Sequence, residues 1–191
     1  MPCMETLGLS GPPQPRDSFF RRLFWPSDNA SDADMLGQQG FWLCLVVGLL
    51  TFAMASLQGH WINGLIACAI FILGGVGVRE HDLFAAISIA SIYVVNIVAT
   101  MLVGRPPGAI SIFAALLLLG NIRGCRIAAK WSRLDPESIP IRMNETWQDK
   151  LVDQMPARVW PKVKYAYYVV ATAFFLLFVA GTVILMHRAH P

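Results

Sequence analysis

Basic side chains recur at helical spacing in one apolar stretch of the chain. The members of this basic stripe are Arg123, Arg126, Lys130 and Arg133. Residues three and four apart lie on one face of a helix, so the four charges are expected to point the same way. Such a face attracts the headgroups of anionic lipids. The alternative is that the charges only fix the orientation of the chain in the membrane.

The same stretch carries a second stripe, made of small residues. Gly120, Gly124 and Ala128 follow one another at intervals of four, which allows another helix to approach the backbone closely. On a helical wheel the small and basic stripes lie roughly 140° apart. The pattern predicts a helix that packs on one side and presents its charges on the other.

A polar face is also expected in an earlier apolar stretch. Tyr93, Asn96 and Thr100 share one side of a helix. An Asn side chain is costly where it faces lipid, so we expect Asn96 to point into the helix bundle. Hydrogen bonding between helices explains such a residue without any substrate. The alternative is a polar pathway or a ligand site.

Residues for catalysis or metal binding do not come together in the sequence. No Asp or Glu lies within the expected spans, which argues against transport driven by intramembrane carboxylates. The chain has no H-E-x-x-H pair and no G-x-S-x-G motif. Its four cysteines form no CxxC pair. We therefore expect no enzymatic activity, no metal and no cofactor.

The composition indicates that lipid surrounds much of the chain. Of its 191 residues, 55% are hydrophobic and only 14% are charged. A soluble domain carries about 25% charged residues. The net charge of +3 is too small to indicate a nucleic-acid partner. The prediction is an all-α integral membrane protein.

Charge-free runs define the expected membrane-spanning helices. Residues 40–78 contain no Asp, Glu, Lys or Arg. As one helix they would reach about 60 Å, twice the hydrocarbon thickness of ~30 Å, so they must fold back. Gln58-Gly59-His60 marks the turn. Residues 39–129 are thus expected to form four helices, at about 40–57, 61–78, 83–103 and 109–129.

The third and fourth of these helices each need a further condition. Asp82 is expected to be the N-cap of the third. The fourth has apolar residues only over 109–122, about 21 Å, which is too short to cross the membrane. It spans if it continues to about Ala129, with Arg123 and Arg126 reaching toward the membrane surface.

The remaining segments are assigned by composition. Residues 1–38 are rich in Gly and Pro and are expected to be a cytoplasmic, largely disordered region. Within them, 18–26 is either an interfacial anchor or a plain basic flank. The rest is expected to contain a cytoplasmic segment at 130–164 with a short amphipathic helix at about 145–155, then a fifth transmembrane helix at 165–186 and a short external tail to 191.

Positive charge sets the expected orientation of this five-helix transmembrane bundle. Of the 15 Lys and Arg residues, only Arg105 and Arg188 fall on one side, which leaves 13 on the other. Positive charge is retained in the cytoplasm, so the N-terminus is expected inside and the C-terminus outside. The excess of Arg over Lys suggests a GC-rich bacterial genome. The expected location is therefore the bacterial inner membrane.

Two classes of function remain open from the sequence. The first is a non-enzymatic membrane component, an accessory, scaffold or lipid-associated subunit. Its partners are expected to be anionic lipids on the cytoplasmic face and, within the membrane, another protein or a second copy. The alternative is a small transporter or channel subunit whose pathway is lined by Tyr93, Asn96 and Thr100.

Overall fold

The computed structural model describes residues 30–102, 104–134 and 147–189. Within these ranges the chain forms helices and no strand. The elements are α2 (Ala30–Leu57), α3 (Trp61–Arg79), α4 (Leu83–Leu102), α5 (Ala109–Leu134), α6 (Trp147–Asp149), the π-helical turn η2 (Lys150–Gln154) and α7 (Met155–Ala189).

The expected all-α membrane bundle is confirmed, because five of these helices are long and apolar enough to cross a membrane. The bounds of α3 and α4 agree closely with the sequence prediction. Asp82 is the N-cap of α4, since its Oδ1 accepts a hydrogen bond from the backbone N–H of Ala85 at 3.1 Å. Helix α5 continues to Leu134 and so reaches the length that its apolar part alone lacks.

Two helices begin earlier than the sequence predicted. Helix α2 starts at Ala30 rather than near residue 40, because acidic residues favour the first turns of a helix. Helix α7 starts at Met155 rather than at 165. Its Pro156 is the second residue of the helix and directly follows the π-helical turn η2. Pro161 remains inside the helix, which continues past it despite the lost hydrogen bond.

The structure differs from the separate amphipathic helix expected at about 145–155. Only the short α6 and η2 are present in its described part, and η2 leads directly into α7. Because a π-helical turn holds more residues than an α-helical turn, the face predicted from α-helical spacing is rotated. Trp147, which α-helical spacing would place on the apolar side with Leu151 and Met155, is 73% exposed, and Asp153, which the same spacing would place opposite, is 9% exposed. The expected segments 1–29, with the anchor at 18–26, and 135–146 lie outside the described residues.

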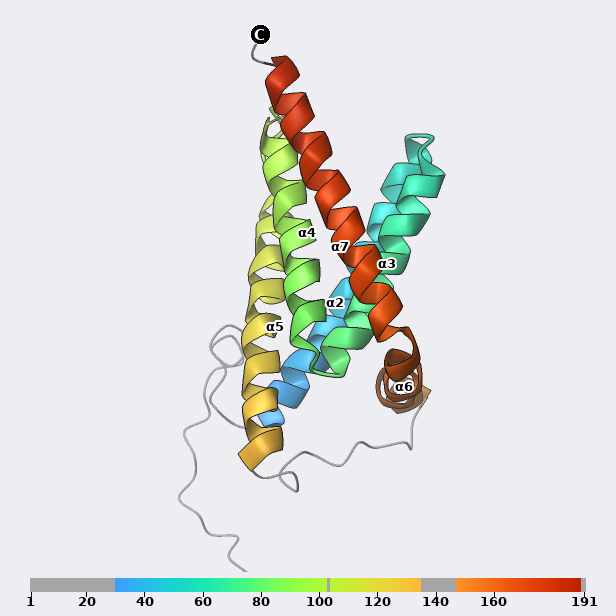
Figure 1. Cartoon of the computed structure of the whole chain (residues 1–191), viewed down its shortest axis with the longest axis vertical. Coiled ribbons are helices and arrows are strands. Elements are labelled where there is room, and N and C mark those ends of the chain that lie inside the picture. The colour runs from blue at the N-terminus through green and yellow to red at the C-terminus, as the bar shows by residue number, and fades with distance from the viewer. Residues whose placement is uncertain (1–29, 103, 135–146, 190–191) are drawn as a thin grey trace, which may run out of the picture.

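The long helices form two hairpins and a fifth helix that packs on both (Figure 1). Helix α2 packs on α3 and α5, helix α4 packs on α5, and α7 contacts α3 and α4. The α3–α4 turn, the end of α5 and the start of α7 lie together, and we call this end the basic end. The α2–α3 and α4–α5 turns lie at the opposite end, called the far end here, where α7 also finishes (Figure 1). The hairpins cross near the basic end and diverge toward the far end.

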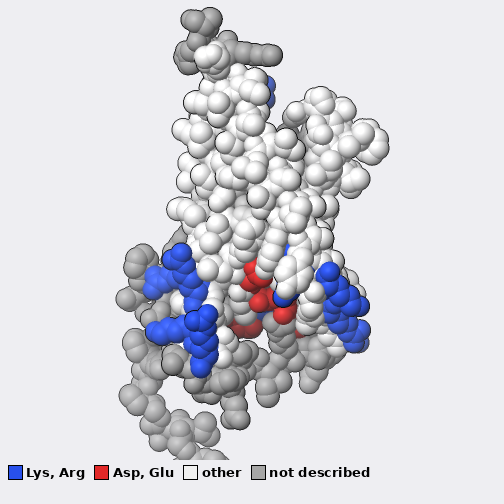
Figure 2. All heavy atoms as spheres, viewed as in Figure 1, with Lys and Arg blue, Asp and Glu red and all other residues white. Residues whose placement is uncertain are grey.

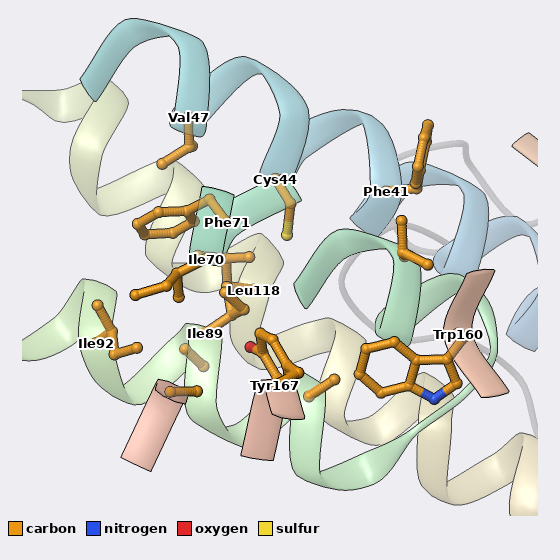
Figure 3. Packing of buried hydrophobic residues seen from close by; sticks show 14 of the residues in the cluster. Phe41, Cys44, Val47, Ile70, Phe71, Ile89, Ile92, Leu118, Trp160 and Tyr167 are labelled. Carbon is orange, nitrogen blue, oxygen red and sulfur yellow. The ribbon is translucent and has the colours of Figure 1, made fainter. Parts of the chain in front are cut away.

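The hydrophobic core lies where the helices cross (Figure 3). It contains buried side chains from all five long helices, including Phe41, Cys44, Phe71, Ile89, Leu118, Trp160 and Tyr167. Close approach there depends on the glycines of α3. A Cβ at Gly74 would lie 2.4 Å from Ile89, and one at Gly75 would lie 2.8 Å from the Cβ of Cys44. The glycine-rich end of α3 therefore holds α2, α4 and α7 around one point.

Replacing Gly77 by Ala is expected to separate these helices. Its Cβ would lie 2.5 Å from the Cβ of Ala85 and 2.5 Å from the Trp160 ring. We expect a loss of about 1–3 kcal/mol in unfolding free energy, as for other overpacked cores. Reversible unfolding in mixed detergent micelles measures it. Gly181→Ala is the control, since nothing lies within 4 Å of its new methyl group. Equal stability of the two variants would contradict the packing role of Gly77.

Candidate functional site

Arg79, the last residue of α3, is held between two carboxylates at the basic end. Its Nη1 donates to Asp34 Oδ1 of α2 at 2.6 Å. Its Nη2 and Nε donate to Asp153 Oδ1 of η2, at 2.5 and 3.0 Å. We call these three residues the Arg79 cluster. It joins α2, α3 and the start of α7 through one side chain.

The Arg79 cluster is largely removed from solvent. The side chains of Arg79, Asp153 and Asp34 are 3%, 11% and 28% exposed. The planar guanidinium presents several N–H donors in fixed directions, so it can serve two carboxylates at once. Nη1 also donates to the backbone oxygen of Asp34 at 3.1 Å, which ties the guanidinium to the first turns of α2. Two carboxylates face one guanidinium, so the formal charge of the three ionised groups is −1.

A second polar group joins the α3–α4 turn to α7. Asp82 uses Oδ1 to cap α4, and its Oδ2 accepts hydrogen bonds from Tyr168 Oη at 2.5 Å and Trp160 Nε1 at 3.3 Å. One turn further along α4, Ser88 Oγ lies 2.9 Å from Tyr167 Oη. The aromatic residues at the start of α7 therefore position both the turn and α4.

The same turn is also fitted closely against α2. His81 adopts a φ of 56°, in the left-handed region that side chains other than glycine rarely enter. A Cβ at Gly37 would lie 2.9 Å from the His81 ring, so the imidazole rests on the backbone of α2. Strained backbone of this kind persists only where the surrounding contacts hold it. Here those contacts come from α2, α4 and α7.

Asn121 of α5 is a further buried polar residue at the α2–α5 contact. It is 2% exposed, and neither atom of its carboxamide has a hydrogen-bond partner within the described part of the chain. A Cβ at Gly40 would lie 2.7 Å from its Nδ2, so the amide fits against the α2 backbone. Asn121 was not predicted from the sequence to be a buried polar residue. Its position next to Gly120, beside the small stripe that was expected to pack, could have indicated that Asn121 lies at a helix contact.

The structure places the two predicted stripes of α5 on different sides. Gly124 is buried, and a Cβ there would lie 3.0 Å from Leu36 of α2, while Gly120 and Ala128 are partly buried. In the basic stripe Arg126, Lys130 and Arg133 are exposed, and Arg123 is partly buried and makes an interaction. The binding of lipid by these residues stays a prediction.

The polar residues of α4 do not lie as expected. Tyr93 is partly buried and packs edge-on against Phe71 of α3, with ring centroids 6.3 Å apart. Asn96 and Thr100 are exposed, so the expected inward orientation of Asn96 is not found. Thr100 Oγ1 donates to the backbone oxygen of Ile97 at 2.7 Å. The reason for the difference is that α3 diverges from α4 toward the far end (Figure 1).

The Arg79 cluster was not predicted from the sequence. Arg79 follows an expected span and Asp34 lies in the segment before the first span. The two residues are 45 positions apart in the sequence, so their contact cannot be read from local spacing. The sequence feature that could have indicated the cluster is an arginine at the end of one apolar segment, with acidic residues next to two other apolar segments. Charged residues beside membrane spans tend to pair with one another. Within the described residues, no group of three or more His, Cys, Asp or Glu side chains is placed to hold a metal ion. The described cysteines, Cys44, Cys68 and Cys125, are buried free thiols.

Comparison of the chain with protein-family models, curated proteins and solved structures finds no match in any of the three.

Removing the Arg79 side chain is expected to destabilise the bundle. Arg79→Met leaves Asp34 and Asp153 without their partner, and breaking a buried ion pair in this way costs about 3–5 kcal/mol. Unfolding in mixed micelles measures the loss. The triple variant Arg79→Met, Asp34→Asn, Asp153→Asn is expected to recover much of it, because it leaves no unpaired buried charge. Arg105→Met, at an exposed position of the far end, is the control. If Arg79→Met unfolds like this control, the cluster does not stabilise the fold.

Proposed function

We propose that this polytopic membrane protein is a non-enzymatic component of a membrane assembly that binds anionic lipid headgroups with its basic end. In this proposal the basic end faces the cytoplasm and the C-terminus lies outside. The observation that carries it is the distribution of charge. On the face drawn in Figure 2, Lys and Arg side chains gather in two groups at the basic end, with acidic side chains between them.

The first group lies on α5, where one helical face changes from basic to aliphatic. Arg126 is exposed, and Leu119 and Ile112, at successive intervals of seven residues on the same face, are 47% and 49% exposed. If Leu119 and Ile112 face lipid tails, Arg126, Lys130 and Arg133 come level with the headgroups. Arg79 is neutralised inside the protein, whereas these exposed charges are available to an external anion.

The second group lies on α7 and shows the same change. Arg158 and Lys162 are exposed, and Tyr165 and Val169 follow on the same face at 69% and 71% exposure. The Nζ of Lys164 lies 4.9 Å from the centroid of the Tyr165 ring. Tyrosine is typical of the boundary between headgroups and hydrocarbon. Both groups therefore support one membrane surface at the basic end.

The transporter alternative has less support from the geometry. It requires a pathway lined by Tyr93, Asn96 and Thr100. Asn96 and Thr100 are exposed on the single chain, so an enclosed pathway would need further protein to cover them.

The proposed orientation predicts the outcome of reporter fusions. Fusions at Ser31 and Trp147 should report the cytoplasm, and a fusion at Arg188 should report the outside, because positive charge is retained inside. Paired alkaline phosphatase and fluorescent-protein reporters measure both compartments. The same side for Trp147 and Arg188 would mean that α7 does not cross the membrane.

Neutralising the basic stripe is expected to weaken lipid binding without unfolding the protein. Arg126→Gln with Lys130→Gln should reduce the affinity for anionic lipid by about 1 kcal/mol per charge. Native mass spectrometry with phosphatidylglycerol and phosphatidylcholine measures retention of each lipid. Arg105→Gln is the control, since it removes one exposed charge at the far end. Unchanged retention of phosphatidylglycerol in the double variant would leave the stripe as an orientation signal only.

A further inference from the structure

Asn96 lies on the face of α4 that packs into the protein, and yet it is exposed. It follows Ile89 by seven residues and Ile92 by four, so the three side chains share a helical face. Ile89 is 0% exposed and Ile92 is 3% exposed, whereas Asn96 is exposed. The packed face of α4 therefore continues toward the far end, where Asn96 is exposed in the described part of the chain.

The divergence of the two hairpins explains this exposure. Tyr93 of α4 still contacts Phe71 of α3, with ring centroids 6.3 Å apart, and the two helices diverge toward the far end (Figure 1). Closer to the far end, the buried residues of α3 pack against α2. A Cβ at Gly64 would lie 2.7 Å from the Cβ of Ala55, and one at Gly48 would lie 3.2 Å from the backbone oxygen of Cys68. On α4, Asn96 is exposed.

The position of Asn96 makes an unpaired carboxamide costly. It lies six residues before Leu102, about 9 Å along the helix axis, and so within the apolar span rather than at its end. A buried amide without a hydrogen bond is strongly disfavoured in hydrocarbon. Within the described residues the Asn96 side chain has no hydrogen-bond partner, since only its backbone oxygen accepts one, from Thr100. The geometry thus favours a hydrogen-bond partner for Asn96 that the described residues do not supply.

We propose that this partner is a second copy of the chain, bound through α4 so that the two Asn96 carboxamides pair across a two-fold axis. The carboxamide carries both donors and an acceptor, so it is complementary to itself. Two copies inserted in the same orientation hold Asn96 at the same depth. A two-fold axis along the membrane normal then brings the two amides level, which a chain of unrelated sequence would match only by chance.

The residues beside Asn96 suit close approach of a second α4. Ala99 and Thr100 have short side chains, and small residues are typical of helix contacts in membranes. The Thr100 hydroxyl already donates to the backbone of its own helix, so the residue presents little unsatisfied polarity. Asn63, another exposed asparagine, lies in the first turn of α3 beside the α2–α3 turn, where water is within reach. Asn96 is therefore the residue on which pairing depends.

This inference is independent of the proposed lipid contact, which uses the other end of the protein. The first test is cysteine cross-linking of the full chain in membranes, in a Cys3→Ser background. Ala99→Cys is expected to give a disulfide-linked dimer on mild oxidation. Val98→Cys is the matched control, because it lies about 160° around the helix from Asn96 and is expected to stay monomeric. Equal cross-linking at both positions, or none at either, would overturn the proposed interface.

The second test measures the strength of the dimer. Asn96→Leu should weaken it about tenfold, the scale of one or two hydrogen bonds between membrane helices. Single-molecule photobleaching in vesicles over a range of protein densities measures the dissociation. Thr100→Val is the control, and it should dimerise as the wild type does.

Unfolding in mixed micelles separates loss of pairing from misfolding. A dimer unaffected by Asn96→Leu, or a different protein held through Asn96 by a monomeric chain, would refute pairing between copies. The Arg126 and Lys130 double variant should dimerise normally, so failure of either proposal leaves the other intact.

Discussion

The guanidinium of Arg79 has to be neutralised at the point where α2, α3 and η2 meet, because the Arg79 side chain is only 3% exposed. Asp34 and Asp153 do this only if α2 is helical from its acidic first turns and if η2 turns its carboxylate inward. The early start of α2 and the π-helical turn before α7 are therefore linked to one ion cluster. Buried pairs add little stability over apolar contacts, but they penalise every arrangement in which a charge loses its partner. In this chain that penalty favours one relative position of the three elements.

The Arg79 cluster also explains why the two ends of the protein are built differently. At the basic end the glycines of α3, the aromatic residues of α7 and the Asp82 hydrogen bonds bring the helices together around it. Toward the far end the helices diverge, and lipid tails can replace the missing protein contacts because both are apolar. Loose packing there has little cost for Leu or Val. It has a cost for the carboxamide of Asn96, because lipid tails offer no hydrogen bonds to an exposed amide.

The sequence predicted the helices well where charges bound an apolar run. The ends of α3 and α4 are of this kind, and the Asp82 cap was predicted because it needs only local contacts. The starts of α2 and α7 were missed, since the expected bounds followed the charge-free apolar runs and both helices begin before those runs. The Arg79 cluster was missed for a different reason. It joins residues separated by 45 and 74 positions, and no local spacing encodes such a contact.

Asn96 and Asn121 show what hydropathy cannot distinguish. Both are single amides in apolar spans, yet Asn121 is 2% exposed against Gly40 of α2 and Asn96 is exposed on α4. In water, burial follows apolar character, and the inner face of a helix can be read from its periodicity. In a membrane both faces are apolar, so that signal is lost. Small residues then give more information. Gly40 lets α5 approach closely enough to cover Asn121, whereas α3 diverges from α4 toward the far end and Asn96 is exposed. Whether an amide is buried in such a protein is decided by where two helix axes diverge, which is a property of the whole bundle.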